Sequence, residues 1–241
     1  MTQPLLTVSN LTKSFHPDGR NPVLKDLSFT AHKGRFLCIL GPSGCGKTTL
    51  LKTIAGFLPP TGGTVEVAGR PVTRPGPDRC MVFQEDALFP WLTINVAFAI
   101  PGKKKRRLEL ARFHLHAVGL SHAATHLPHQ LSGGMKQRAA LARALALSPQ
   151  ILLMDEPFGS LDTQAKAQMQ KLLLTLWAQL AQTILFVTHD PTEAATLADK
   201  VLIMGNGRIE KTMEINLQRP RNRKDVELFR KANELEEELK V

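Results

Sequence analysis

The sequence predicts an α/β fold with a core of parallel strands and an antiparallel β subdomain at the N-terminal side. Short apolar or β-rich runs recur along the chain, and in its middle and C-terminal parts they alternate with segments of helical apolar spacing. Nearer the N-terminus the runs are separated by turn clusters instead, His16–Gly19 and Pro59–Gly63. A length of 241 residues suits one large domain that buries its own core.

The individual elements follow from these patterns in chain order. Apolar and β-branched runs predict strands at Leu6–Val8, Phe36–Leu40, Thr64–Val67, Met81–Phe83, Ile151–Met154, Thr183–Val187 and Val201–Met204. Helical spacing predicts helices at Lys47–Phe57, Gly134–Leu147, Thr163–Ala181 and Thr192–Ala198. The tail Asp225–Lys240 is expected to be an amphipathic helix, with its apolar stripe formed by Leu228, Phe229, Ala232, Leu235 and Leu239.

Composition excludes several classes of protein. Apolar residues make up 43% and charged residues 22% of the chain, which is typical of a folded globular protein. No run reaches the roughly 18 apolar residues that cross a bilayer. The first residues lack the pattern of a secretory signal, so we expect a cytoplasmic location. Three cysteines without C-x-x-C spacing, Cys38, Cys45 and Cys80, indicate neither a disulfide framework nor a zinc site.

A formal net charge of +10 favours anionic partners. The densest basic run is Lys103–Arg107, and it carries no interleaved aromatic residues, so a nucleic-acid groove is weakly supported. Two interpretations of this run remain open. It could be the solvated start of a helix, or a patch that faces phospholipid headgroups.

A phosphate-binding loop directly follows the predicted strand Phe36–Leu40 and opens the next helix. Residues 41–48 read Gly-Pro-Ser-Gly-Cys-Gly-Lys-Thr, which fits G-x-x-x-x-G-K-[ST] in the context that this motif requires. Backbone N–H groups form the anion nest, Lys47 reaches the β- and γ-phosphates, and the Thr48 hydroxyl suits Mg²⁺. The loop predicts polyphosphate binding by Gly41, Pro42, Ser43, Gly44, Cys45, Gly46, Lys47, Thr48 and the adjoining Thr49.

Two carboxylates end a second buried strand. Ile151–Met154 is followed at once by Asp155 and Glu156, which a parallel sheet would place at its carboxyl edge, where ligands collect. Asp155 would hold Mg²⁺ or its waters, and Glu156 would orient and deprotonate the attacking water. The sequence therefore predicts hydrolysis of the bound nucleotide in addition to its binding.

A third motif narrows the class of phosphate-loop protein. Residues 131–138 read Leu-Ser-Gly-Gly-Met-Lys-Gln-Arg and lead into a helix, and this resembles the signature of ATP-binding cassette (ABC) ATPases. Met135 stands where many of these proteins carry glutamine. The resemblance implies a P-loop NTPase with a RecA-like parallel sheet core and an inserted helical signature subdomain near residues 85–148. It also implies one ATPase domain over 1–241, within which the amphipathic helix predicted from the apolar stripe would occupy the C-terminal part near 219–241.

The same resemblance assigns roles by position. It implies that Ser132, Gly133 and Gly134 contact the γ-phosphate held by the other member of a head-to-tail dimer, formed with a second copy or a paralogue. It further implies adenine stacking by Phe15, contact with Mg²⁺ and water by Gln84, a dimer-crossing loop at Ser160-Leu161-Asp162, and a γ-phosphate contact by His189. The expected cofactors are ATP and Mg²⁺.

The segments Pro75–Arg79 and Val82–Thr93 resemble the branch of the family that serves nitrate, sulfonate and taurine importers. This likeness implies an ATPase that powers import of a small anionic solute. Its expected partners are membrane permease subunits, which dock near Gln84 to Leu92, and an extracytoplasmic solute-binding protein; no nucleic-acid partner is expected. The chain would then lie on the cytoplasmic face of the inner membrane. The alternatives are an exporter ATPase and a soluble ABC ATPase outside transport.

Overall fold

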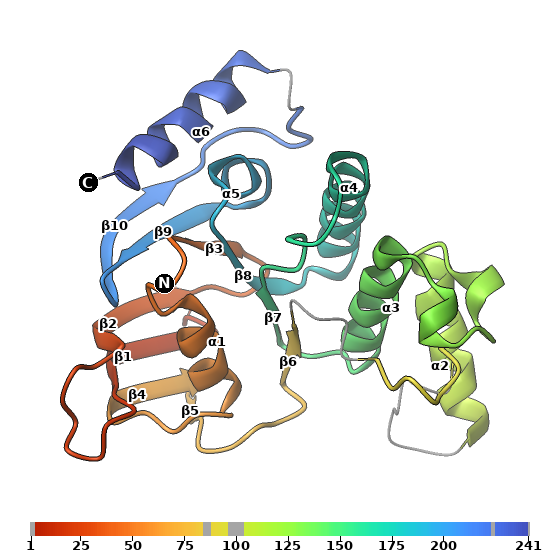
Figure 1. The fold of residues 1–241 in the computed structure, drawn as a ribbon, viewed down its shortest axis with the longest axis horizontal. Coiled ribbons are helices and arrows are strands. Elements are labelled where there is room, and N and C mark those ends of the chain that lie inside the picture. Colours follow the sequence, from red (N-terminus) through yellow and green to blue (C-terminus); the bar gives the residue numbers. More distant parts are fainter. Residues whose placement is uncertain (1–2, 84–87, 96–103, 223–224, 241) are drawn as a thin grey trace. The chain divides into compact units, whose positions relative to one another are not determined.

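The computed structural model describes residues 3–83, 88–95, 104–222 and 225–240 (Figure 1). The chain divides into two compact units, one made of Met1–Gly76 with Ala181–Val241 and the other of Pro77–Leu180. We refer to them as unit 1 and unit 2. Among the helices of the described residues, none has the length and apolarity needed to span a membrane.

Unit 1 begins with a four-stranded antiparallel sheet in the order β2-β1-β4-β5. Its strands are β1 (Leu6–Lys13), β2 (Leu24–Ala31), β4 (Gly62–Val67) and β5 (Arg70–Pro71). The antiparallel prediction is thus confirmed, but β2 was missed. Its buried residues are Leu24, Leu27 and Ala31, a spacing of three and four, because its register with β1 shifts and Asp26 takes a positive φ of 58°. Period-two alternation therefore gives no signal for this strand.

The second sheet of unit 1 carries the parallel strands. β3 (Phe36–Leu40) pairs in parallel with β8 (Thr183–Thr188) and with β9 (Lys200–Gly205), and β10 (Arg208–Glu214) adds an antiparallel edge. Every residue of β3 and β8 is buried, as expected for strands covered on both faces. β10 was missed because most of its residues are exposed or half-buried and polar.

The described residues of unit 1 also form three α-helices. α1 (Lys47–Ala55) follows β3, and α5 (Pro191–Leu197) follows β8. α6 (Val226–Glu238) lies against α5 (Figure 1). Its buried residues are Leu228, Ala232 and Leu235, spaced i, i+4 and i+7, whereas Phe229 is 64% exposed. The predicted stripe is therefore wrong at Phe229, which is turned about 100° away from Leu228 around the helix axis.

Arg221 ties the segment before α6 to the end of α5. Its buried guanidinium donates hydrogen bonds to the carbonyls of Ala195 (2.8 Å), Ala198 (2.6 Å), Ile215 (3.0 Å) and Leu217 (3.0 Å). Burial lowers the pKa of Arg221 to about 10, with the charge of Arg219 adding to the shift.

Replacing Arg221 by alanine is expected to destabilise unit 1 because these buried carbonyls would lose their shared donor. We expect a loss of about 3 kcal/mol, which corresponds to a fall in melting temperature of about 6–12 °C for a chain of this size. Thermal unfolding followed by circular dichroism measures it. Arg20, whose ion pair with Asp18 is exposed, provides the control, and its alanine variant should unfold close to wild type. Equal melting temperatures for the two variants would contradict this role of Arg221.

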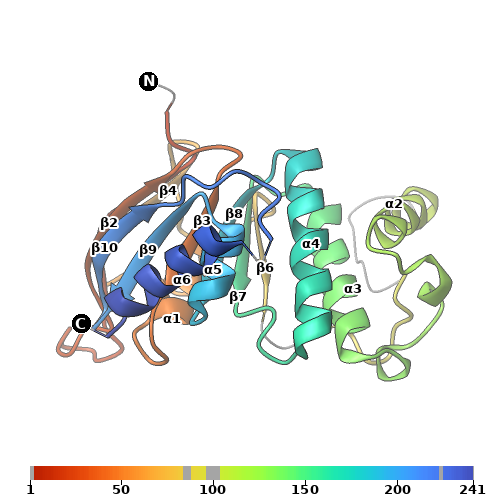
Figure 2. The ribbon, with the colours of Figure 1, turned by 90° about the horizontal axis from the view of Figure 1, so that it is seen from above.

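The described residues of unit 2 form two parallel strands and three α-helices. β6 (Arg79–Val82) pairs in parallel with β7 (Ile151–Asp155). The helices are α2 (Lys104–Ala117), α3 (Gly133–Ala146) and α4 (Thr163–Leu180), with short 3-10 turns at Ser121–Ala123 and Pro128–Gln130. Within this unit α3 lies between α4 and α2 (Figure 2). Residues 104–107 of the basic run open α2, as the helix-start interpretation predicted, and Lys103 lies outside the described residues.

Candidate functional site

The phosphate loop connects β3 to α1 and is held by close backbone packing. A Cβ on Gly41 would lie 2.2 Å from the carbonyl oxygen of Met204, so no larger residue fits there. Gly46 caps α1 with φ 106°, a conformation that L residues with side chains rarely adopt. The backbone of this loop therefore explains why its glycines are required, and the first turn of α1 adjoins it, where the N-terminus of the helix favours an anion.

Lys47 lies at the centre of the loop. Its side chain is buried, and Nζ donates hydrogen bonds to the carbonyl oxygens of Gly41 (2.8 Å) and Pro42 (2.9 Å). These contacts hold the ammonium over the concave side of the loop. Thr48 follows at the first turn of α1 and is exposed, while the backbone carbonyl of Thr49 accepts a hydrogen bond from the Thr53 hydroxyl. A compact positive charge is thus fixed beside the backbone N–H groups, as a polyphosphate site requires.

Cys45 fills the space inside the loop. Its side chain is buried, and its Sγ would be 2.9 Å from a Cβ on Gly41. Burial raises the pKa of the Cys45 thiol, with the nearby Lys47 ammonium acting in the opposite direction. Cys45 is therefore a neutral thiol at pH 7 that packs the loop.

The segment after β8 meets the start of the phosphate loop. The backbone N–H of Gly41 donates to the carbonyl oxygen of Thr188 (3.4 Å). The Thr188 hydroxyl donates to Glu193 Oε2 (2.6 Å) and accepts from the backbone N–H of Asp190 (3.0 Å), so the chain on either side of His189 is fixed. His189 itself is exposed. Asp190 caps α5 through Thr192 N and Glu193 N. The predicted histidine thus lies on an ordered segment that is hydrogen-bonded to the loop.

Phe15 is exposed in the loop after β1. Its ring is 60% exposed, and Lys13 Nζ lies 5.4 Å from the ring centroid. The Ser14 hydroxyl, by contrast, is buried and donates to the carbonyl of Arg20 (2.6 Å). An aromatic face held on an ordered loop, with its neighbour anchored, can stack on a planar ligand such as a purine.

The two carboxylates lie in unit 2, at the end of β7. Asp155 is the last residue of the strand and is buried, and Glu156 is half-buried. Glu156 has a positive φ of 42°, and its carbonyl accepts from Gly159 N (3.1 Å). A left-handed backbone at a glutamate costs roughly 1–2 kcal/mol. Such strain in a position that glycine would adopt freely is typical of functional residues.

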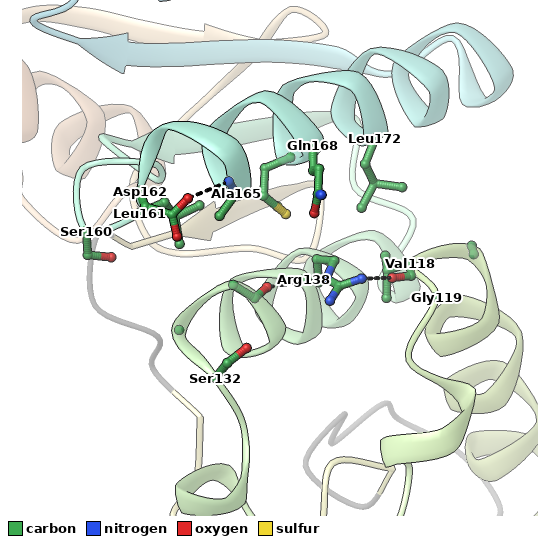
Figure 3. Close-up of a pocket in the computed structure, with 14 residues that line it drawn as sticks. Val118, Gly119, Ser132, Arg138, Ser160, Leu161, Asp162, Ala165, Gln168 and Leu172 are labelled. Atoms are coloured by element: carbon green, nitrogen blue, oxygen red, sulfur yellow. Dashed lines mark hydrogen bonds between the residues drawn. The ribbon is translucent and has the colours of Figure 1, made fainter.

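Figure 3 shows the signature residues and the loop before α4 on one pocket of about 500 Å³. Ser132 caps α3, where its hydroxyl accepts from Met135 N (3.4 Å), and Asp162 caps α4 by accepting from Gln164 N and Ala165 N (both 2.9 Å). Gly133 and Gly134 lie beside Ser132, and Ser160 and Leu161 beside Asp162. Unit 2 therefore brings together two of the predicted motifs, at the N-termini of two helices.

Arg138 was not singled out from the sequence, yet it braces this pocket. Its Nε donates to Gly134 O and its Nη1 donates to Val118 O, both at 3.4 Å, so it links the first turn of α3 to the chain after α2 (Figure 3). Arg138 is the last residue of the signature motif at 131–138, and this position could have marked it as a candidate site residue. Thr188 and Glu193 were also missed, and nothing local in the sequence marks them.

An aromatic patch, defined as Phe89 and Trp91, is exposed in unit 2. Trp91 is 72% exposed and Phe89 38%, and their ring centroids are 5.9 Å apart. Arg143, in the last turn of α3, lies with its guanidinium 5.9 Å from the Phe89 ring centroid. Burial lowers the pKa of Arg143. Gln84, the other residue predicted to act here, lies outside the described residues.

Comparisons with known proteins agree with these motifs. Residues 24–159 match the family described as ABC transporter. The bicarbonate transport ATP-binding protein CmpD of Synechocystis sp. is 44% identical, over 92% of this chain and 83% of that protein. The nitrate import ATP-binding protein NrtD of the same organism is 42% identical, over 95% and 93%.

Solved structures show the same fold. The structure of cbiO1 from Clostridium perfringens, part of the ABC transporter complex cbiONQ, has a TM-score of 0.80 at 26% identity and covers 89% of this chain and 90% of its own. A dimeric ATP-binding cassette in a post-hydrolysis state, bound to ADP and Pi, has a TM-score of 0.77 at 29% identity, over 88% and 100%. Fold, phosphate loop and relatives agree, and the chain belongs to the ABC transporter family as an ATPase domain that binds and hydrolyses ATP to power transport.

Proposed function

We propose that this chain is the ATP-hydrolysing subunit of an importer for a small inorganic or similarly small anion. The near full-length similarity to bicarbonate and nitrate ATP-binding proteins carries this proposal. The sequence resemblance anticipated nitrate but not bicarbonate. Selectivity would reside in the permease and in a solute-binding protein, because the ATPase domain has no need to touch the solute.

Each predicted site residue has a role in this activity. Phe15 stacks on the adenine, and the loop Gly41–Thr49 binds the phosphates with Lys47 at its centre. Glu156 accepts a proton from the attacking water, a role that typically contributes 10²–10⁴-fold. His189 donates a hydrogen bond to a γ-phosphate oxygen. Ser132, Gly133 and Gly134, with Asp162, complete the site of the other member of a head-to-tail dimer; the dimeric state of the ADP- and Pi-bound relative supports this arrangement.

The available side chains suit Mg²⁺ as the accompanying ion. Thr48 offers an exposed hydroxyl and Asp155 a carboxylate, and Gln84 would add an amide oxygen. Mg²⁺ prefers a few oxygen ligands from the protein, with phosphate oxygens and water molecules in its other coordination positions. When bound, the ion neutralises charge on the β- and γ-phosphates. Asp155 would hold it or its waters at the end of β7.

The proposal is tested by purifying the tagged chain from its own membranes in mild detergent and reconstituting the complex in vesicles. We expect a polytopic permease to co-purify, and a solute-binding protein to be required for ATP-driven uptake of labelled nitrate or bicarbonate. ATP-driven movement of the solute away from the side that holds the ATPase domain, which is export, would favour the exporter alternative. Recovery of the chain with no membrane protein would favour an ATPase outside transport and contradict the proposal.

The aromatic patch supports permease docking at residues 89–92, because exposed aromatic rings at this density mark interaction surfaces. Replacing Trp91 by alanine is expected to reduce permease recovery at least tenfold, since aromatic anchors at interfaces are worth about 2 kcal/mol or more. The isolated chain should keep its ATPase rate. Phe57 is 50% exposed in unit 1, and its alanine variant is the matched control. Equal loss of permease from both variants would contradict docking at the patch.

A further inference from the structure

The outer surface of α2 forms a basic face, which we define by Lys105, Arg106, Glu109, Arg112, Phe113 and His116. These six residues are exposed and lie within an arc of about 120° around the helix. Ala111 and Leu115 are buried on the other side. The basic face therefore points away from the core of unit 2, and Arg107 is exposed beside it.

The basic face has an unbalanced charge. It carries three Lys or Arg side chains and one carboxylate, Glu109. Within the part of the chain that the structure describes, the side chains of Lys105, Arg106 and Arg112 make no hydrogen bond or ion pair. The positive charge is thus available to a partner outside the chain.

The position of these cations works against the helix. The first turn of α2 has no acidic residue, and Lys105 and Arg106 lie there. The N-terminus of a helix bears partial positive charge, so cations in its first turn are destabilising. Lys105 and Arg106 are therefore not placed there to stabilise α2. An anionic surface outside the chain would instead attract both cations and offset their repulsion by the helix N-terminus.

Phe113 adds an apolar group to the same face. Its side chain is 66% exposed, although its ring is perpendicular to that of His114, with the two ring centroids 5.2 Å apart. The ring of Phe113 therefore lies among the cations of the basic face, where a surface that offers both anionic and apolar groups, as phospholipid headgroups and their glycerol region do, would contact both. A single-stranded nucleic acid would instead call for several stacking aromatics, and α2 has one.

We propose that the basic face of α2 contacts the anionic phospholipid headgroups of the bilayer that holds the transporter. The inference rests on the proposed function in one respect, that a permease holds this ATPase domain beside a membrane, and the basic face would add a second attachment that is separate from permease docking. The proposal depends neither on the transported solute nor on the direction of transport. Because each Lys or Arg near an anionic leaflet strengthens binding about fivefold, the face would tune the orientation of unit 2 at the membrane.

The test is vesicle flotation of the full 241-residue chain without any permease. Vesicles of phosphatidylcholine alone are compared with equimolar phosphatidylcholine and phosphatidylglycerol. We expect binding only to the second. The double variant Arg106→Gln/Arg112→Gln should bind about 25-fold more weakly, and Phe113→Ala should also weaken binding. ATPase rate and melting temperature should not fall in either variant, since these side chains are exposed and have no proposed role in the nucleotide site.

The matched control is Lys33→Gln/Arg70→Gln, which removes the same charge from exposed positions in unit 1. Equal loss of binding in both double variants would assign the attraction to the net charge of +10 and overturn the proposal. Equal binding to both kinds of vesicle would overturn it as well. If Arg106→Gln/Arg112→Gln weakened binding to single-stranded RNA and left vesicle binding unchanged, the partner of α2 would be a nucleic acid and the proposal would fail.

Discussion

Replacing Glu156 by glutamine is expected to leave ATP binding intact and to slow hydrolysis at least about tenfold. The amide keeps the size of the side chain but cannot accept the proton of the attacking water. ATP should therefore accumulate in a closed dimer, which light scattering detects as a doubling of mass when ATP is added. Phosphate release measures the rate. Near-normal turnover would contradict Glu156 as the base.

The strained backbone of Glu156 supplies a second, independent measurement. Glutamine at this position keeps φ at 42°, whereas glycine adopts that angle without strain. Both variants lack the carboxylate, so both should hydrolyse ATP at least about tenfold more slowly than wild type. We expect Glu156→Gly to melt about 2–4 °C above Glu156→Gln, which corresponds to relief of about 1 kcal/mol. A glycine variant that melted lower would show that the side chain, and not φ, governs the local stability.

The fold could be predicted where burial and local pattern agree. β3 and β8 are continuous apolar runs because both faces are covered, and α1, α3, α4 and α5 keep helical spacing. β2 and β10 were missed for physical reasons. A register shift removes the alternation of β2, and β10 is an edge strand whose outward residues are polar. In both cases tertiary pairing, and not local preference, decides the structure.

The site could be predicted where the backbone conformation allows only one residue type, because that residue then appears as a motif in the sequence. The phosphate loop needs its glycines, as the 2.2 Å approach at Gly41 shows, and so a motif exists to be found. The brace made by Arg138 and the hydrogen bond from Thr188 to Glu193 depend on side chains that fold into place, and the sequence pattern does not carry them. The φ of Glu156 likewise has no signature, because glutamate is not a residue that favours it.

Two inactive variants are expected to restore activity when mixed, if each site of the dimer is shared. Lys47→Ala should lose ATP binding, since its Nζ is the positive charge at the centre of the loop. Ser132→Asp keeps an acceptor for Met135 N and so preserves the cap of α3, but it places a negative charge where the γ-phosphate of the partner chain would lie. Each variant alone should have little activity.

Equal mixing with random exchange makes half of the dimers mixed, and each mixed dimer has one site with both an intact Lys47 and an intact Ser132. Because half of the dimers then hold one of two sites, about a quarter of wild-type activity should return if the sites act independently. Phosphate release after mixing measures it, with the two variants assayed apart as controls. No recovery would mean either that one site cannot act alone or that Ser132 serves its own chain. A covalently linked dimer of wild type with the double variant Lys47→Ala/Ser132→Asp separates these outcomes. It has no complete shared site, so activity in this linked dimer would show that Ser132 acts within its own chain, and its inactivity would leave the shared site in place.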